Sequence, residues 1–263
     1  MSAMSLPGVL GYTERVSIQT RGKFVKDLSN QRVVVIGGTS GIGLATAIAA
    51  AELGAEVYAA SRSEASAEKA RSKAPGEINF RVADTHDVSS LEAVFSEAGP
   101  INHLVSAATG ANRTMAPFME QTAEQFSEAF NKFWGYTNVA RHGVPHLVED
   151  GSLTLVSGTP ARKCNPGMSS LSCVGSAVEA LGRALALEIA PKRVNVVAPG
   201  IIDTAMFDWM GDNKEATFEQ MSKNIPLRRV GLPEELANAI IFFMTTGYVT
   251  GTTVDVDGGT LLP

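Results

Sequence analysis

The segment of the sequence most suited to holding phosphate is Gly37-Gly38-Thr39-Ser40-Gly41-Ile42-Gly43. Glycine lets the backbone approach a pyrophosphate closely, and a helix that begins here points free N–H groups and its positive dipole end at the phosphates. The run follows a β-branched segment and precedes an alanine-rich one, which is the order of a strand and a helix. We therefore predict a dinucleotide site, with a purely structural turn as the alternative. Its predicted residues are Gly37, Thr39, Ser40, Gly41, Ile42 and Gly43.

The end of the second predicted strand indicates which dinucleotide binds. An acidic side chain there suits the ribose hydroxyls of NAD, whereas an arginine can pair with the 2′-phosphate of NADP. This chain has Ser61-Arg62-Ser63. A guanidinium makes bidentate contacts with phosphate, and the two serine hydroxyls can add hydrogen bonds. We predict NADP as the cofactor, with a solvated surface arginine as the alternative.

The elements that must position these residues alternate along the chain. Short apolar runs typical of buried parallel strands alternate with longer helical segments. This order predicts an α/β fold, a single-domain Rossmann-type doubly wound parallel sheet over 29–263, with an arm of unknown role at 1–28 and a lid around 203–226. The expected strands are 32–36, 56–60, 79–82, 103–106, 152–157, 193–198 and 252–254. The expected helices are 42–53, 89–98, 123–147 (distorted by Pro145), 173–190 and 233–244.

Composition limits the classes of partner. The net charge is -5, and no basic run is present, so nucleic acid is not an expected partner. Two cysteines, Cys164 and Cys173, have no accompanying ligand set, and His142 and His146 share a helical face without a third ligand, so no metal site is predicted. The N-terminal region has no long apolar core, and no apolar run reaches the length of a membrane span. We expect a cytoplasmic protein without membrane contact.

Together these features resemble the short-chain dehydrogenase/reductase family over Leu28 to Gly259. Besides the phosphate loop, Asp84 matches the acidic residue that contacts adenine, and the segment from Asn195 to Gly200 resembles the one that holds the nicotinamide carboxamide. The resemblance implies a homo-oligomer, a dimer or tetramer, formed through the two long helices. It adds these residues to the predicted cofactor site: Asp84, Pro199, Gly200, Ile202 and Thr204.

The catalytic pattern of the family is missing. Aligned with it, Gly158, Leu171 and Gly175 stand where the family has its serine, tyrosine and lysine. Ser157 is adjacent to the serine position, so a shift of one residue would restore that hydroxyl. In the long central helix, Asn131 matches the remaining position of the catalytic network, and Lys132 follows it. The predicted catalytic residues are Asn131, Lys132 and Ser157.

The departure has a chemical consequence. Carbonyl reduction requires a proton donor as charge develops on oxygen, and leucine cannot donate one. An iminium ion already carries its charge, so a hydride in a shaped pocket suffices. The chain resembles the atypical short-chain reductases of the fungal malbrancheamide and paraherquamide type. These lack the usual catalytic residues, reduce an iminium with NADPH and then guide a Diels–Alder cyclisation.

We therefore predict an NADPH-dependent reductase of unusual mechanism. Its expected substrate is an imine, iminium or activated carbonyl of a small apolar, secondary-metabolite-like molecule, and the reduction can be coupled to cyclisation. The alternatives are a non-redox cyclase or isomerase and a catalytically dead NADP-binding scaffold. Two further interpretations stay open: Arg162 and Lys163 bind an anionic substrate or form a solvated loop, and Asp203 and Asp208 of the lid attract a cationic one.

Overall fold

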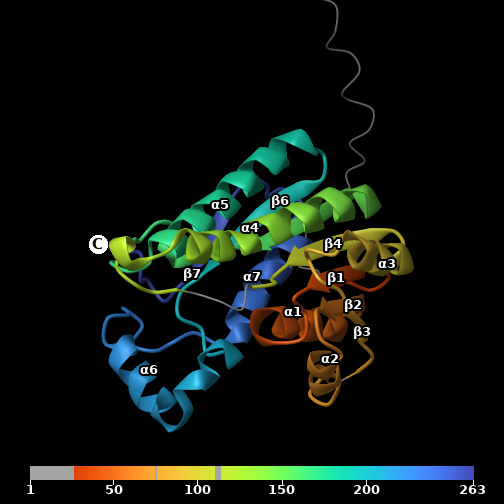
Figure 1. Ribbon diagram of the computed structural model, residues 1–263. Helices are drawn as coiled ribbons and strands as arrows, with labels where there is room; N and C mark the ends of the chain where they lie inside the picture. Colours follow the sequence, from red (N-terminus) through yellow and green to blue (C-terminus); the bar gives the residue numbers. More distant parts are fainter. Residues whose placement is uncertain (1–26, 75, 110–113) are drawn as a thin grey trace, which may run out of the picture.

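The computed structural model describes residues 27–74, 76–109 and 114–263. Across those ranges the chain forms a seven-stranded sheet, in the order β3-β2-β1-β4-β5-β6-β7, in which every neighbouring pair is parallel. Figure 1 shows helices on both faces of this sheet. The strands are β1 (Arg32–Ile36), β2 (Glu56–Ser61), β3 (Asn79–Val82), β4 (Ile101–Ser106), β5 (Leu147–Val156), β6 (Arg193–Pro199) and β7 (Thr253–Val256).

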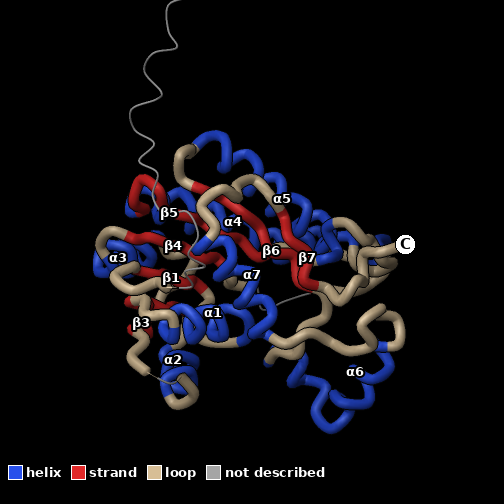
Figure 2. Tube along the Cα trace, turned by 180° about the vertical axis from the view of Figure 1, so that it is seen from behind, coloured by secondary structure: helices blue, strands red, loops and turns tan. Residues whose placement is uncertain are grey.

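The helices divide between the two faces. One face carries α1, α2 and α7, and the other carries α3, α4 and α5 (Figure 2). The α-helices are α1 (Gly41–Glu52), α2 (Glu64–Arg71), α3 (Val88–Ala98), α4 (Ala123–Gly143), α5 (Ser169–Glu188), α6 (Lys214–Ser222) and α7 (Pro233–Thr245). The short 3₁₀ helices are η1 (Phe118–Glu120), η2 (Val144–His146), η3 (Thr159–Ala161) and η4 (Ala205–Asn213).

Strand β1 shows why the apolar runs are continuous. Val33 and Val35 pack under α1 and α7, whereas Val34 and Ile36 pack under α3, α4 and α5. Successive side chains of a strand point to opposite faces, and helices cover both faces here, so every position must be apolar. This confirms the predicted fold class. The strand order reverses between β1 and β4, and ligands of open α/β sheets bind at that point, beyond the carboxyl ends of the strands.

Several predicted boundaries are wrong. Helix α4 ends at Gly143, not Leu147, because Pro145 lies in the 3₁₀ turn η2, and β5 begins immediately afterwards at Leu147 rather than at Ser152. Helix α5 begins at Ser169, four residues before the predicted Cys173. The short helices α2 and α6 had no apolar periodicity to reveal them, and in α2 the local signal is the cap at Ser63.

The start of the domain also differs slightly. Leu28, which was assigned to the N-terminal arm, is only 1% exposed, and its N–H donates to Leu53 O at 2.8 Å. It therefore belongs to the core between β1 and α1. The rest of the arm, up to Lys26, lies outside the described residues.

Helix α5 is long and apolar enough to span a membrane by length and composition. Its apolar face, however, packs on the sheet beside α4, and Val178 is completely buried there. A helix between a sheet and a neighbouring helix has the same composition as a membrane span, because it too is surrounded by apolar groups. The composition of α5 is therefore explained by its place in the core.

Candidate functional site

The glycine loop between β1 and α1 is a tight turn that requires glycine. Gly37 has a φ of +87°, and a Cβ at this position would lie 2.4 Å from Ala108 N in the loop after β4. A Cβ on Gly43 would lie 2.1 Å from Gly37 O. Neither approach is possible for a residue with a side chain. The loop therefore lies directly at the point where the strand order reverses.

The N-terminus of α1 has no side-chain cap. Its N-cap residue, Ser40, makes no capping hydrogen bond, and the first turn has no acidic residue. By contrast, Ser63, Asp87 and Thr122 cap the starts of α2, α3 and α4 with their side chains. The first N–H groups of a helix need an acceptor. At α1, an anion such as a pyrophosphate fits this requirement, together with the dipole.

The residues after β2 fit the 2′-phosphate in part. Arg62 is exposed, and its guanidinium has no ion-pair or hydrogen-bond partner among the described residues. The Ser61 hydroxyl is buried without a partner. Ser63 is different, since its hydroxyl caps α2 by accepting from Ser66 N at 3.4 Å. Arg62 and the Ser61 hydroxyl therefore have no partner among the described residues, whereas the Ser63 hydroxyl caps α2.

The other predicted cofactor residues follow the ends of strands. Asp84 follows β3, and its carboxylate accepts from His86 N at 2.9 Å. Pro199 ends β6, and the N–H of the next residue, Gly200, donates to Val256 O at 3.0 Å. Ile202 is buried and pairs with Gly231. Thr204 Cγ2 lies 3.1 Å from the position of a Cβ on Gly41, so the segment after β6 reaches the glycine loop.

The structure brings together two of the three predicted catalytic residues. Lys132 Nζ donates to Ser157 O at 3.1 Å and lies 5.4 Å from the centre of the Tyr136 ring. The hydroxyl of Ser157 is buried and donates to Glu179 Oε1 at 3.1 Å. Asn131 lies on the exposed face of α4. Of the two neighbouring residues Asn131 and Lys132, it is therefore Lys132 whose side chain reaches the end of β5.

Glu179 is a site residue that the sequence prediction missed. It lies on α5, is 5% exposed, and receives Arg162 Nε at 3.3 Å as well as Ser157. Arg162 also forms a bidentate pair with Asp255. Partial burial lowers the pKa of Arg162, but the hydrogen bond to Asp255 and the charge of Glu179 raise it above the ordinary value. The available signal was an acidic residue in the middle of helix α5, among small and apolar residues from Val174 to Leu181.

The interpretation of Arg162 and Lys163 as an anion site is not supported. Arg162 is paired with Glu179 and Asp255, and Lys163 Nζ donates to Thr260 O at 2.6 Å. Both cations therefore tie the loop after β5 to the C-terminal segment.

The space beside Gly175 is filled by protein. A Cβ on Gly175 would lie 2.9 Å from Ala161 Cβ and 3.3 Å from Ala161 N. Ser176 fixes the same turn by donating to Ala161 O at 2.9 Å. Gly158 differs, because a Cβ there would meet only Pro160 Cδ, at 3.4 Å. The 3₁₀ turn η3 therefore rests on α5 where a lysine side chain would have to leave the helix.

Two acidic residues of the predicted lid, Asp203 and Asp208, pair with the same lysine. Lys214 Nζ lies 2.7 Å from Asp203 and 3.1 Å from Asp208. The hydrogen bond that Lys214 donates to Asp203 is the largest cause that raises the pKa of Lys214. Phe207 and Phe218 pack edge to face at 5.3 Å beside this pair. Lys214 therefore offsets one of these two negative charges, which reduces their attraction for a cationic substrate.

The two histidines of α4 and η2 contact a glutamate. His142 Nδ1 lies 2.8 Å from Glu92 Oε1 of α3, and His146 Nε2 lies 3.4 Å from Glu92 Oε2. The hydrogen bond with His142 is the main reason why the pKa of Glu92 is lowered. Within the described residues, no group of three or more His, Cys, Asp or Glu side chains could hold a metal ion. The contact joins α3 to the end of α4.

A doubly wound parallel sheet, with a glycine loop and an uncapped helix at its switch point, defines a dinucleotide-binding Rossmann domain. A family model described as enoyl-(acyl carrier protein) reductase matches residues 37–260. The chain is 33% identical over 251 residues to the short-chain dehydrogenase/reductase ATR9 of Stachybotrys chlorohalonatus, covering 89% of this chain and 98% of the relative. The chain therefore belongs to the short-chain dehydrogenase/reductase family, which confirms the resemblance.

Two solved structures are similar over nearly the whole domain. The MalC reductase/Diels-Alderase of Malbranchea aurantiaca is 30% identical, with a TM-score of 0.82, covering 90% of this chain and 99% of that one. The NADPH-bound short-chain oxidoreductase of Pseudomonas aeruginosa PAO1, described as containing an atypical catalytic center, is 31% identical. Its TM-score is 0.82, covering 89% and 97% of the two chains.

Proposed function

We propose that this protein is an NADPH-dependent reductase that works without the tyrosine–lysine relay of its family. The observation that carries the proposal is the contact of Ala161 with Gly175, which fills the place of the lysine, while the glycine loop remains built for a dinucleotide. The proposed substrate is an imine, iminium or activated carbonyl of a small apolar molecule. The similarity to an oxidoreductase described as having an atypical catalytic center supports this proposal.

The nucleotide-binding residues fit NADPH, which supplies the hydride when bound. The N-terminus of α1 would hold the pyrophosphate, and Arg62 the 2′-phosphate. Asp84 would accept from the adenine. The backbone of Pro199 and Gly200, with Thr204, would orient the nicotinamide end.

Lys132 is the proposed holder of the proton. A lysine ammonium is a hydrogen-bond donor, and the contact with Ser157 O places this one at the end of β5, beside the predicted reaction site. A neutral imine needs a proton on nitrogen as it is reduced, whereas an N-alkylated iminium does not. Leu171 and Gly175 offer no proton at the positions where the family has one. Lys132 should therefore matter for neutral imines and not for iminium ions.

The test uses a matched pair of substrates. The oxidation of NADPH is followed with a cyclic imine, its N-methyl iminium salt and the corresponding ketone. We expect the iminium to be reduced fastest and the ketone not at all. Lys132→Met should slow imine reduction by about 10²–10⁴-fold, the usual contribution of general acid catalysis, and leave the iminium rate unchanged. Reduction of the ketone at a rate equal to that of the iminium would contradict the proposal.

Cyclisation is a second candidate function, favoured by the similarity to a protein described as a reductase/Diels-Alderase. In that case the pocket would act as a template after reduction. The distinction is experimental: a cyclase forms the ring from an already reduced substrate in the presence of oxidised NADP. A reduced substrate that stays acyclic in the presence of the protein and oxidised NADP assigns reduction alone.

We also propose that η4 and α6 form the substrate lid over 203–226. Figure 1 shows α6 set apart from the sheet, and Trp209 in η4 is 75% exposed.

A homodimer or homotetramer through α4 and α5 is proposed from the family. The exposed side chains of Trp134 and Leu187 on these helices support it. Sedimentation analysis of the Leu187→Glu variant tests this interface, and an unchanged mass would place the contact elsewhere.

A further inference from the structure

One carboxylate, that of Glu179 in α5, holds the turn after β5 at both of its ends. At the front of the turn, the Ser157 hydroxyl donates to Glu179 Oε1 at 3.1 Å, and at its end Arg162 Nε lies 3.3 Å from the same oxygen. The two terminal nitrogens of the Arg162 guanidinium pair with Asp255 instead. Because Ser157 and Glu179 are buried, water has little access to these contacts. A single oxygen therefore fixes where the segment 157–162 begins and ends.

The front of this turn also supplies the acceptor for Lys132. Its Nζ donates to Ser157 O at 3.1 Å, so the residue whose hydroxyl binds Glu179 also carries the carbonyl that binds the lysine. The N–H of Ser157 donates to Val197 O at 2.9 Å, which fixes the preceding peptide to the sheet. The next residue is Gly158, and glycine restricts the backbone least. Glu179 restrains the residues on both sides of Gly158, and with them the direction of the Ser157 carbonyl.

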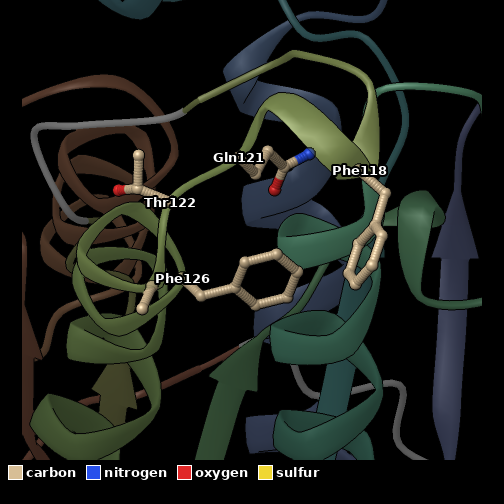
Figure 3. Close-up of a pocket in the computed structure, with 5 residues that line it drawn as sticks. Phe118, Gln121, Thr122 and Phe126 are labelled. Carbon is tan, nitrogen blue, oxygen red and sulfur yellow. The ribbon is translucent and has the colours of Figure 1, made fainter.

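The helix that carries Lys132 is anchored independently of this carboxylate. One turn after Lys132, the Tyr136 hydroxyl donates to the last carbonyl of β5 at 3.2 Å. Just before α4, Gln121 (Figure 3) donates through Nε2 to Ala116 O at 2.6 Å and to Gly167 O, two residues before α5, at 3.4 Å. Loss of the contact in α5 would therefore leave the backbone of Lys132 in place and change the position of its acceptor.

We propose that Glu179 is a positioning residue for Lys132. By holding both ends of the turn, it keeps the Ser157 carbonyl where it directs the Lys132 ammonium to the end of β5. The inference rests on the proposed function, in which Lys132 supplies the proton for neutral imines. The Ser157 hydroxyl then acts through its contact with Glu179 and does not touch the substrate.

The test breaks the same hydrogen bond from its two ends. Glu179→Met removes the acceptor with little change in volume, and Ser157→Ala removes the donor. Each should lower kcat for the cyclic imine about 10- to 100-fold with KM unchanged, the effect of a misplacement of about 1 Å, and leave the N-methyl iminium rate unchanged. Neither should slow imine reduction further in a Lys132→Met background, because the residue that they position is then absent.

Two further variants separate this hydrogen bond from general effects on α5. Glu179→Gln keeps an oxygen for the Ser157 hydroxyl and should retain most of the imine rate. Glu188→Met places methionine at an exposed position of the same helix and should leave both rates unchanged. Glu179→Met leaves a buried hydroxyl unpaired and lowers stability. If it does not fold, Ser157→Ala carries the test, because Glu179 keeps its contact with Arg162 there.

A measurement without substrate separates this inference from the proposed reaction. The protein is labelled with ¹³C at lysine Cε, and the NMR signal of Lys132 is assigned by its loss in Lys132→Arg. We expect this signal to shift in Glu179→Met and in Ser157→Ala, and to stay in place in Glu188→Met. A wild-type protein that reduces neither imine nor iminium would contradict the proposed function, and the NMR signal would still decide whether Glu179 positions Lys132.

Three results would overturn the proposal. The first is a Lys132 signal that is the same in the wild type, Glu179→Met and Ser157→Ala. The second is an equal loss for imine and iminium in these variants, which would assign Glu179 to stability alone. The third is a slow Ser157→Ala beside a fully active Glu179→Met, which would show that the Ser157 hydroxyl acts on the substrate directly.

Discussion

Both the glycine loop and the turn after β5 depend on a glycine where two backbones meet, but with opposite results. At Gly43, a Cβ would lie 2.1 Å from Gly37 O, and this close turn leaves the start of α1 open to an anion. At Gly175, a Cβ would lie 2.9 Å from Ala161 Cβ, and the contact closes the space that a lysine would need. A close approach at a glycine therefore shapes an open turn in one region and fills a space in the other.

The two regions also differ in how their polar groups are used. Around the glycine loop, Arg62 and the Ser61 hydroxyl have no partner among the described residues. Around β5, Ser157, Glu179 and Arg162 hold one another. Polar groups without partners suit a ligand that brings its own, whereas mutually paired groups are part of the scaffold. Polar groups without partners thus lie around the glycine loop, whereas those at the end of β5 are paired with one another.

The largest effect is expected at the glycine loop. Gly43→Ala cannot keep the turn, so NADPH binding should fall at least about 1000-fold, as the helix N-terminus no longer faces the phosphates. Gly247→Ala is the control, because a Cβ there meets nothing within 4 Å. Calorimetric titration of both variants is the measurement. Wild-type affinity in Gly43→Ala would mean that the loop does not hold the cofactor.

The stability of the sheet that carries both regions should fall in acid. His103 of β4 is 5% exposed and lies between Ser152 Oγ and Gln31 Oε1, at 2.8 and 2.6 Å. Burial first, and the charge of Arg193 second, lower the pKa of His103 from 6.5 to about 4.

Between pH 6.5 and about pH 4, His103 binds a proton in the unfolded chain but stays neutral in the folded chain. The free energy of unfolding should therefore fall as the pH drops to 4, by up to about 3 kcal/mol. Denaturant unfolding at several pH values measures this slope, and His103→Gln should flatten it. An equal slope in this variant would assign the acid sensitivity to other groups.

The turn after β5 should not accommodate a lysine at position 175, where the family has one. Gly175→Lys forces its Cβ against Ala161, so we expect a loss of about 1–3 kcal/mol of stability, the usual cost of overpacking. Combined with Leu171→Tyr, it should not raise the rate of NADPH oxidation. Gly158→Ser is the matched control, since its Cβ makes an ordinary contact with Pro160. A large gain in rate would show that the reaction is limited by the absence of this tyrosine and lysine, and that no other group has taken their role.

The smallest effect concerns the choice of nucleotide. Arg62→Ala should weaken NADPH about tenfold and leave NADH unchanged, since an exposed guanidinium contributes about one charge-assisted hydrogen bond to the 2′-phosphate. Arg62→Lys should retain part of the preference, because it keeps the charge without the fork. Equal losses for both nucleotides would remove Arg62 from the 2′-phosphate site.

The parts predicted correctly from sequence are those with a local cause. The apolar runs of β1 and β6 are buried on both faces of the sheet, and Gly37 and Gly43 stand where no Cβ fits. Periodicity and glycine spacing report such constraints directly. The fold and the position of the glycine loop follow from them.

The parts that failed depend on contacts between distant segments. Glu179 and Asp255 are 76 residues apart, yet Arg162 joins them. No spacing rule predicts that Arg162 would be engaged by its own chain, or that Lys214 would pair with Asp203 and Asp208. Such pairs depend on how the helices and loops pack on the sheet, and the alignment positions of Leu171 and Gly175 could not show what fills the space.

The central claim is that hydride transfer continues without the relay, and the fate of a labelled hydride tests it most directly. NADPH carrying deuterium at either face of C4 is supplied with the N-methyl iminium salt, and the product is analysed by mass spectrometry. We predict that one of the two labelled forms, and only one, delivers deuterium to the product. A product without deuterium from either form, or an iminium that is not consumed at all, would contradict this claim.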